Sequence, residues 1–77
     1  MKRCTLGSLN VGQRGIVTSL DVKGVTRRRM LDLGLVPGSV VESLRRSPAG
    51  DPTAYNIRGA VIALRSDESC KIHVDPI

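Results

Sequence analysis

Two cysteines and one histidine are the side chains of this sequence best suited to chemistry. Thiolate and imidazole are the ligands that zinc and other late transition metals prefer. Cys70 and His73 are three residues apart, which suits a turn leading into a strand, whereas Cys4 lies far away and no Cys-x-x-Cys pair supports it. Cys70 and His73 are therefore the candidate ligands, for Fe²⁺ or Zn²⁺, although no metal is required. The alternative is that Cys70 packs as a small apolar residue and His73 is an ordinary strand residue.

No set of residues for catalysis is evident. The single histidine has only Ser69 near it in sequence as a hydroxyl partner, which does not define a triad. Asp67 and Glu68 are adjacent, so on one short turn they do not face each other across a substrate. No glycine-rich loop ends in Gly-Lys-Ser or Gly-Lys-Thr, the pattern that cradles phosphates. We therefore expect a protein that is not an enzyme.

The basic residues outnumber the acidic ones, which favours an acidic partner. Twelve Lys and Arg against seven Asp and Glu give a net charge of +5. The alternative is a charge that serves solubility alone. The densest run, Arg27-Arg28-Arg29, would fan across roughly 200° of a helix and so would not form one stripe along a phosphate backbone.

Aromatic side chains are nearly absent, because Tyr55 is the single aromatic residue among 77. Stacking platforms for single-stranded nucleic acid and grooves for proline-rich peptides need several aromatic rings. We therefore expect no specific nucleic-acid binding and no proline-rich ligand.

The elements that must position these residues are mostly short strands. Glycine and proline recur densely and leave apolar runs of strand length over residues 15–20, 40–46, 53–58, 60–65 and 71–74. Residues 60–65 are apolar nearly throughout, which predicts burial on both faces. Residues 47–52 are too long for a tight turn and predict a protruding loop. Five strands in so short a chain predict a single domain over residues 1–77, a small and partly closed barrel that leaves few free edges.

One segment predicts a helix. Residues 25–33 contain no Gly or Pro, and Gly34 follows where a left-handed C-cap would lie. Met30 and Leu33 have helical spacing, and an exposed Met or Leu beside arginines would form a patch for a partner protein. The alternative is that these side chains are buried in the core.

The longest apolar stretch, residues 33–41, is much shorter than the roughly 20 residues of a spanning helix and contains Gly34, Pro37 and Gly38. The first residues do not read as a signal peptide. We expect a cytoplasmic protein.

The stretch RRRMLDLGLVPGSVV over residues 27–41 resembles the signature of the ferrous iron transport protein A (FeoA-type) family. The resemblance continues through residues 45–52 (RRSPAGDP) and residues 57–65, and it includes the opening Leu6, Leu9 and Gly12. It therefore covers almost the whole chain.

The resemblance implies an SH3-like barrel with an inserted helix, and a cytosolic accessory role beside the membrane GTPase that imports ferrous iron. Residues that would face this partner are Arg27, Arg28, Met30 and Leu33, and second the loop with Pro48 and Asp51. Gly34, Pro37 and Gly38 match the family's structural turn.

The same fold also occurs as the C-terminal module of iron- or manganese-dependent repressors. A transition-metal-binding or oligomerising module, with weak self-association, is therefore the alternative function.

Overall fold

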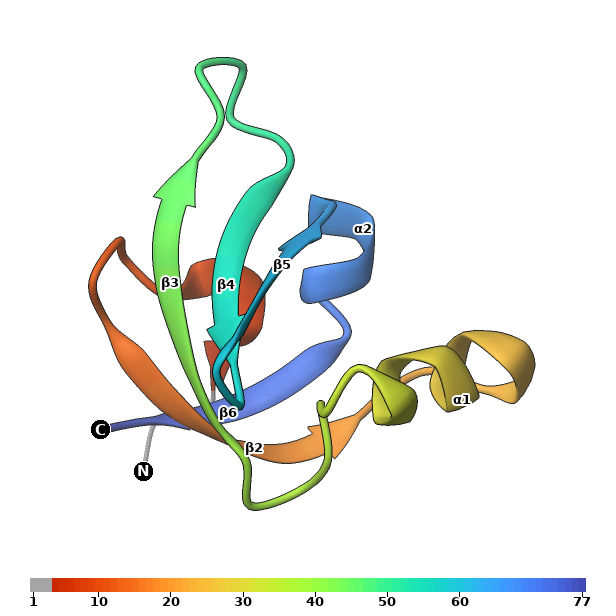
Figure 1. Ribbon diagram of the computed structural model, residues 1–77. Helices are drawn as coiled ribbons and strands as arrows, with labels where there is room; N and C mark the ends of the chain where they lie inside the picture. Colours follow the sequence, from red (N-terminus) through yellow and green to blue (C-terminus); the bar gives the residue numbers. More distant parts are fainter. Residues whose placement is uncertain (1–3) are drawn as a thin grey trace.

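The computed structural model describes residues 4–77. The first three residues, on which the expectation of no signal peptide partly rests, lie outside the described residues. Figure 1 shows short strands that curl around one core, with one longer helix at the side. The elements are β1 (Cys4–Thr5), a 3-10 turn (Leu6–Ser8), β2 (Arg14–Leu20), α1 (Gly24–Asp32), β3 (Val40–Arg46), β4 (Thr53–Ile57), β5 (Ala60–Leu64), α2 (Ser66–Ser69) and β6 (Ile72–Pro76).

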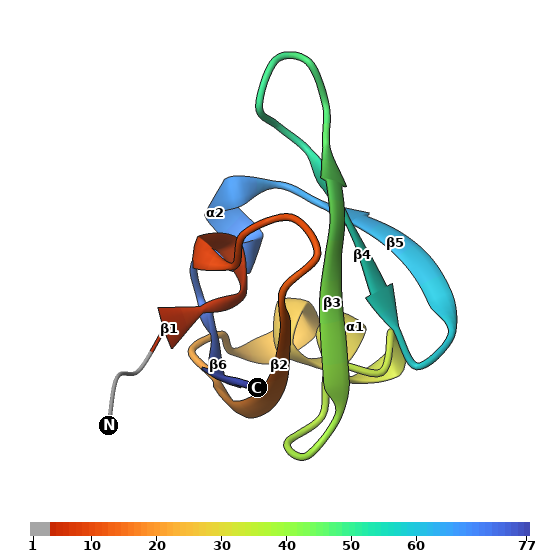
Figure 2. The ribbon, with the colours of Figure 1, turned by 90° about the vertical axis from the view of Figure 1, so that its left-hand side faces the viewer.

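The strands form one antiparallel sheet in the order β1-β6-β2-β3-β4-β5. β6 lies between β1 and β2, as Figure 2 shows, although it comes last in the sequence. The mainly β, partly closed architecture is confirmed, but the sheet has six strands where five were expected. The additional strand, β1, contains two residues and pairs only with β6. Two residues are too few to show the alternation of apolar and polar side chains that predicts a strand.

The core follows the two-residue period of the strands. In β4 and β6 every second side chain is buried, as the alternation of a half-buried strand requires. Tyr55, the single aromatic side chain, is the largest residue in the core. The fully enclosed apolar side chains come from every strand except β1, from the 3-10 turn and its C-cap, from α1 and from the turn that follows it. They are Leu6, Leu9, Val17, Met30, Leu35, Val41, Tyr55, Ile57, Leu64, Ile72 and Val74.

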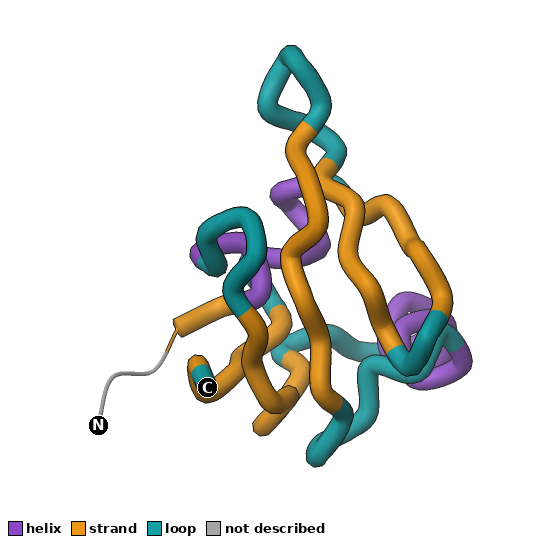
Figure 3. The backbone as a smooth tube through the Cα atoms, turned by 60° about the vertical axis from the view of Figure 1, so that its left-hand side comes forward, coloured by secondary structure: helices purple, strands orange, loops and turns teal. Residues whose placement is uncertain are grey.

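The prediction that residues 60–65 are buried on both faces is wrong. β5 is an edge of the sheet, and Val61 is 64% exposed. A continuous apolar run is typical of a central strand, but here only Leu64 is fully buried, and Ile62 is half-buried against the core. The predicted loop at residues 47–52 is confirmed, because it extends beyond the body of the domain in Figure 3.

α1 ends in a hydrogen-bonded glycine cap. Gly34, at φ +100°, donates its N–H to the Leu31 carbonyl at 3.0 Å, and Leu35 donates to the Met30 carbonyl at 3.1 Å. These two bonds are those of a Schellman motif, and the buried side chains of Met30 and Leu35 are its usual apolar pair. The helix lies one residue earlier than the predicted 25–33, with Leu33 as its C-cap.

The turn after α1 is fixed to the sheet. Ser39 donates its N–H to the Val36 carbonyl at 3.0 Å, with Pro37 and Gly38 between them. Gly38 has φ +95°, so the pair follows the residue pattern of a type II turn. Gly38 donates to the Val17 carbonyl at 2.7 Å, which joins the turn to β2. Gly34, Pro37 and Gly38 therefore set the path between α1 and β3.

Ser43 offers a stability prediction in the core. Its hydroxyl is fully buried and has no hydrogen-bond partner within residues 4–77. An unpaired buried hydroxyl costs about 1–3 kcal/mol of desolvation. We expect Ser43→Ala to raise the free energy of unfolding by about 1 kcal/mol in a urea titration. Ser69→Ala is the control, because Ser69 is also buried but its hydroxyl donates to the Ser66 carbonyl. A loss of stability in Ser43→Ala would contradict the prediction.

Candidate functional site

The basic run on α1 is divided between two sides of the helix. Arg29 faces α2, where its Nη2 lies 3.3 Å from Glu68 Oε2. Arg27 and Arg28 are exposed, and neither forms an ion pair with any residue of the described range 4–77. The fan that the helical period predicted is therefore present, and it leaves two adjacent arginines free.

Arg27 and Arg28 belong to one continuous stripe of the helix. They line a shallow hollow of about 380 Å³ together with residues at helical spacing, Gly24, Leu31 and Asp32. We call these five residues the α1 face. Leu31 is half-buried and lies between the charged groups, so the face offers an apolar centre with a charged rim. The sequence reasoning chose Met30 and Leu33 for this role and missed Leu31, although the four-residue spacing from Arg27 identifies it.

The expectation that Met30 faces a partner is wrong. Its exposed fraction is 0%, because it points from α1 into the barrel and packs within the core cluster. Leu33 is half-buried and also packs against this cluster. Both side chains therefore pack against the core, as the alternative stated above expected. A single short helix on a small barrel must attach through its apolar side chains.

The loop between β3 and β4 holds the other two residues expected to face a partner. Pro48 is exposed near its tip. Asp51 is half-buried, and its Oδ1 accepts a hydrogen bond from the Ser66 N–H at 2.8 Å, which links the loop to the start of α2. Asp51 therefore has a structural task. The loop and α1 lie at different ends of the molecule in Figures 1 and 3, so they do not form one surface.

The three side chains that could ligate a metal lie in different places, with Cys4 and His73 on opposite faces of the sheet. Cys4 pairs with Val74 and Thr5 with His73, and neighbouring strand residues point to opposite faces. Cys4 therefore packs toward the core with the buried Val74, while His73 points to the other face. Cys70 is exposed at the end of α2. Within residues 4–77, no group of three or more His, Cys, Asp or Glu side chains is placed to hold a metal ion, so the donor set does not fit a zinc or iron site.

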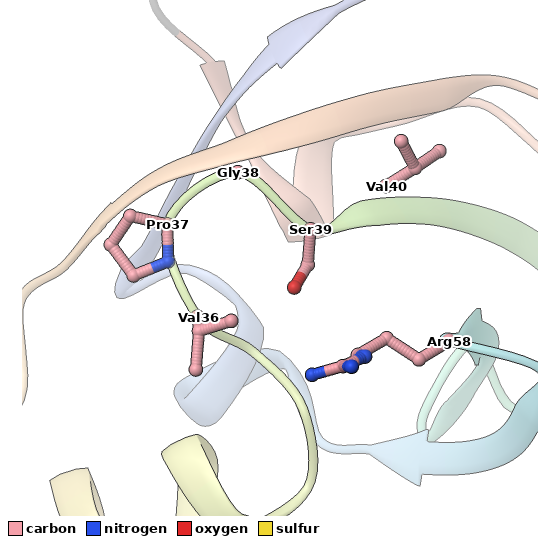
Figure 4. Close-up of a pocket in the computed structure, with 6 residues that line it drawn as sticks. All are labelled: Val36, Pro37, Gly38, Ser39, Val40 and Arg58. Carbon is pink, nitrogen blue, oxygen red and sulfur yellow. The ribbon is translucent and has the colours of Figure 1, made fainter.

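A second hollow lies beyond the helix end. It is open, of about 550 Å³, and lined by residues 36–40 and Arg58 (Figure 4). Arg58 reaches it from the turn between β4 and β5. We did not identify Arg58 as a site residue from the sequence. The available signal was an Arg-Gly pair between two apolar runs of strand length.

Comparisons with known proteins give a consistent answer. The family model described as FeoA domain matches residues 4–76. A Porphyromonas gingivalis protein, the Fe(2+) transport protein A/Fe(2+) transporter FeoB fusion protein, is 31% identical over 72 residues. That match covers 94% of this chain but 8% of the relative.

Solved structures agree with the family model. The solution structure of the FeoA protein from Chlorobium tepidum superimposes with a TM-score of 0.89 at 38% identity, covering 95% of this chain and 70% of that one. The crystal structure of Stenotrophomonas maltophilia FeoA, complexed with zinc and described as a procaryotic SH3 domain protein, gives 0.81 at 29% identity, covering 92% and 88%. The SH3-like fold is therefore confirmed.

The expected likeness to metal-dependent repressors also holds, for the fold alone. A manganese-dependent transcriptional repressor superimposes with a TM-score of 0.87 at 22% identity, and the match covers all of this chain and 38% of that one. No helix within residues 4–77 is long and apolar enough to cross a membrane.

Proposed function

This chain belongs to the FeoA domain family, and from that premise we propose that it is a noncatalytic accessory domain of ferrous iron uptake. It works at the cytoplasmic side of the membrane. There it docks through the α1 face on the GTP-binding part of the iron transporter and modulates its activity.

The observation that carries this proposal is the fusion in Porphyromonas gingivalis. In that relative, a segment similar to this chain and the transporter FeoB are parts of one polypeptide. Joining two units by a short flexible linker raises their effective concentration to about the millimolar range, so even a weak contact between them is populated. When the two are separate chains, a surface patch on the small domain must bind the transporter without the help of a linker.

The α1 face supports this role through its exposure and charge. Arg27 and Arg28 have no ion-pair partner in the described chain, and Leu31 places an apolar group between them. Val25, on the same short helix, is 86% exposed. An apolar centre bordered by arginines is typical of docking surfaces, where arginine contributes both stem packing and charge-assisted hydrogen bonds.

Reversing the charge of the α1 face tests the proposal. We expect the Arg27→Glu/Arg28→Glu chain to bind the soluble GTP-binding domain of the cognate transporter about tenfold more weakly or worse. Amide NMR titration of the ¹⁵N-labelled chain measures this, and in the unmodified chain the shifts should centre on the α1 face, residues 24–32. Both arginines are exposed, so the variant should keep the wild-type fold.

Arg45→Glu/Arg46→Glu is the matched control, because these adjacent arginines are exposed at the loop end of β3 and form one long side-chain hydrogen bond, from Arg46 Nη2 to the Leu9 carbonyl at 3.5 Å. If the control weakened binding and the α1 variant did not, the docking surface would belong to the loop end. If the unmodified chain did not bind at all, the proposed partner would be wrong. Metal coordination is given no part in this function, since the donor residues of the described chain do not fit it.

A further inference from the structure

The turn between β4 and β5 contains an arginine in an unfavourable backbone conformation. Two residues, Arg58 at φ +51° and Gly59 at φ +86°, connect the strands. Such turns prefer Asn-Gly or Asp-Gly, because a β-carbon is strained at positive φ. Asn56 completes the turn by accepting a hydrogen bond from the Gly59 N–H at 3.1 Å. Arginine at this position therefore costs backbone strain, and the turn itself gains nothing from the guanidinium.

Arg58 is exposed as a residue, but its stem lies against the end of α1. A β-carbon built on Gly34 would lie 3.0 Å from Arg58 Cδ, so the stem lies against the backbone at the end of α1 in space that only glycine leaves free. From there the side chain extends into the hollow of residues 36–40 (Figure 4). In this view the guanidinium lies opposite Val36, and the Ser39 hydroxyl points toward it.

The guanidinium has no partner within residues 4–77. None of the hydrogen bonds and ion pairs formed by the described side chains involves it, and the other residues that line the hollow are uncharged. Arginine offers five N–H donors in a planar fork that matches a carboxylate. An unpaired arginine, a hydroxyl and an apolar wall thus border one open space.

We propose that the Arg58 hollow is a binding site for an acidic side chain of a partner peptide, with an apolar neighbour of that side chain on the wall of Val36, Pro37 and Val40. A carboxylate fits better than a phosphate, because phosphate and phosphopeptide sites gather several cations and this hollow has one. The apolar wall also disfavours a doubly charged phosphate, because it cannot replace the hydration that the phosphate loses on binding. The site is separate from the α1 face and does not depend on transporter docking.

A pair of capped peptides tests the proposal on the full chain. Neutral-ended Leu-Glu-Leu is titrated into ¹⁵N-labelled protein beside Leu-Gln-Leu, which has the same shape without the charge. We expect saturable shifts of the Arg58 Nε–H and of the Gly38 and Ser39 amides with the Glu peptide. Affinity should fall about tenfold or more with the Gln peptide, and by a similar factor in Arg58→Gln, which keeps the stem. Arg45→Gln, which removes an exposed charge outside the hollow, should bind as the unmodified chain does.

Equal affinity for the two peptides, or undiminished binding by an Arg58→Gln chain with wild-type core shifts, would overturn the proposal. Absence of saturable shifts with the Glu peptide would do the same. Inorganic phosphate at matched ionic strength is the third ligand. If it bound at Arg58 more tightly than the Glu peptide, the hollow would be a phosphate site and the choice of carboxylate would be wrong.

Discussion

A Met30→Asp chain is expected to be unfolded at room temperature. Met30 is completely enclosed and joins α1 to the core through the Schellman pair with Leu35. Truncating a buried Met costs about 2–5 kcal/mol, and an unpaired buried carboxylate adds several more. Domains of this size hold about 3–5 kcal/mol in total. Circular dichroism and the dispersion of the amide NMR spectrum would show the loss directly.

Met30→Leu is the matched control, because a swap that nearly conserves volume usually costs less than about 1.5 kcal/mol. It should leave the spectrum dispersed and the α1 face able to bind. A Met30→Asp chain that stayed folded and lost only partner binding would contradict the burial seen here. It would return Met30 to the surface role that the sequence suggested.

Gly34→Ala should destabilise the domain more than Gly38→Ala, although both glycines have nearly the same φ, +100° and +95°. Positive φ costs a residue with a β-carbon on the order of 1–3 kcal/mol at either position. At Gly38 no heavy atom lies within 4 Å of the added carbon, whereas at Gly34 it would meet Arg58 Cδ at 3.0 Å and Ile57 Cγ2 at 3.4 Å. We expect this crowding to add about 1 kcal/mol or more in urea unfolding.

Shortening the arginine separates the two causes. In an Arg58→Ala background the crowding at Gly34 is mostly removed, so Gly34→Ala should cost less there than in the unmodified chain. The difference is the coupling energy of a double-mutant cycle. Equal losses for Gly34→Ala and Gly38→Ala would mean that the arginine stem does not rest on the helix end.

Local chemistry was readable from the sequence. Gly34 as a helix cap, the Pro37-Gly38 turn and the loop at residues 47–52 each depend on a few adjacent residues, and each forms as expected. Patterns within one strand also gave the mainly β class. These features need no knowledge of distant neighbours.

The predictions that were wrong concern features that depend on contacts between segments distant in sequence. Apolar residues alone did not show that residues 60–64 lie at an edge or that Met30 points inward. The register of β1 against β6 makes Cys4 and His73 point to opposite faces. A strand of two residues is too short for its register to be predicted from the sequence. Arg58 was missed because the residues beside its side chain, Gly34 and residues 36–40, are distant from it in sequence.

The position of β6 between β1 and β2 governs how the domain can assemble. Its partners in β1 and in β2 are separated from it by more than fifty residues, for example Cys4 from Val74 and Val17 from Val74. Closing such long loops costs conformational entropy before any pairing is gained, which slows folding relative to hairpins. The pairs β2–β3, β3–β4 and β4–β5 each join strands that are consecutive in the chain, and all three are antiparallel, so they can form locally. On a ribosome, that meander can form early, whereas β1 has no strand to pair with until the residues of β6 have emerged.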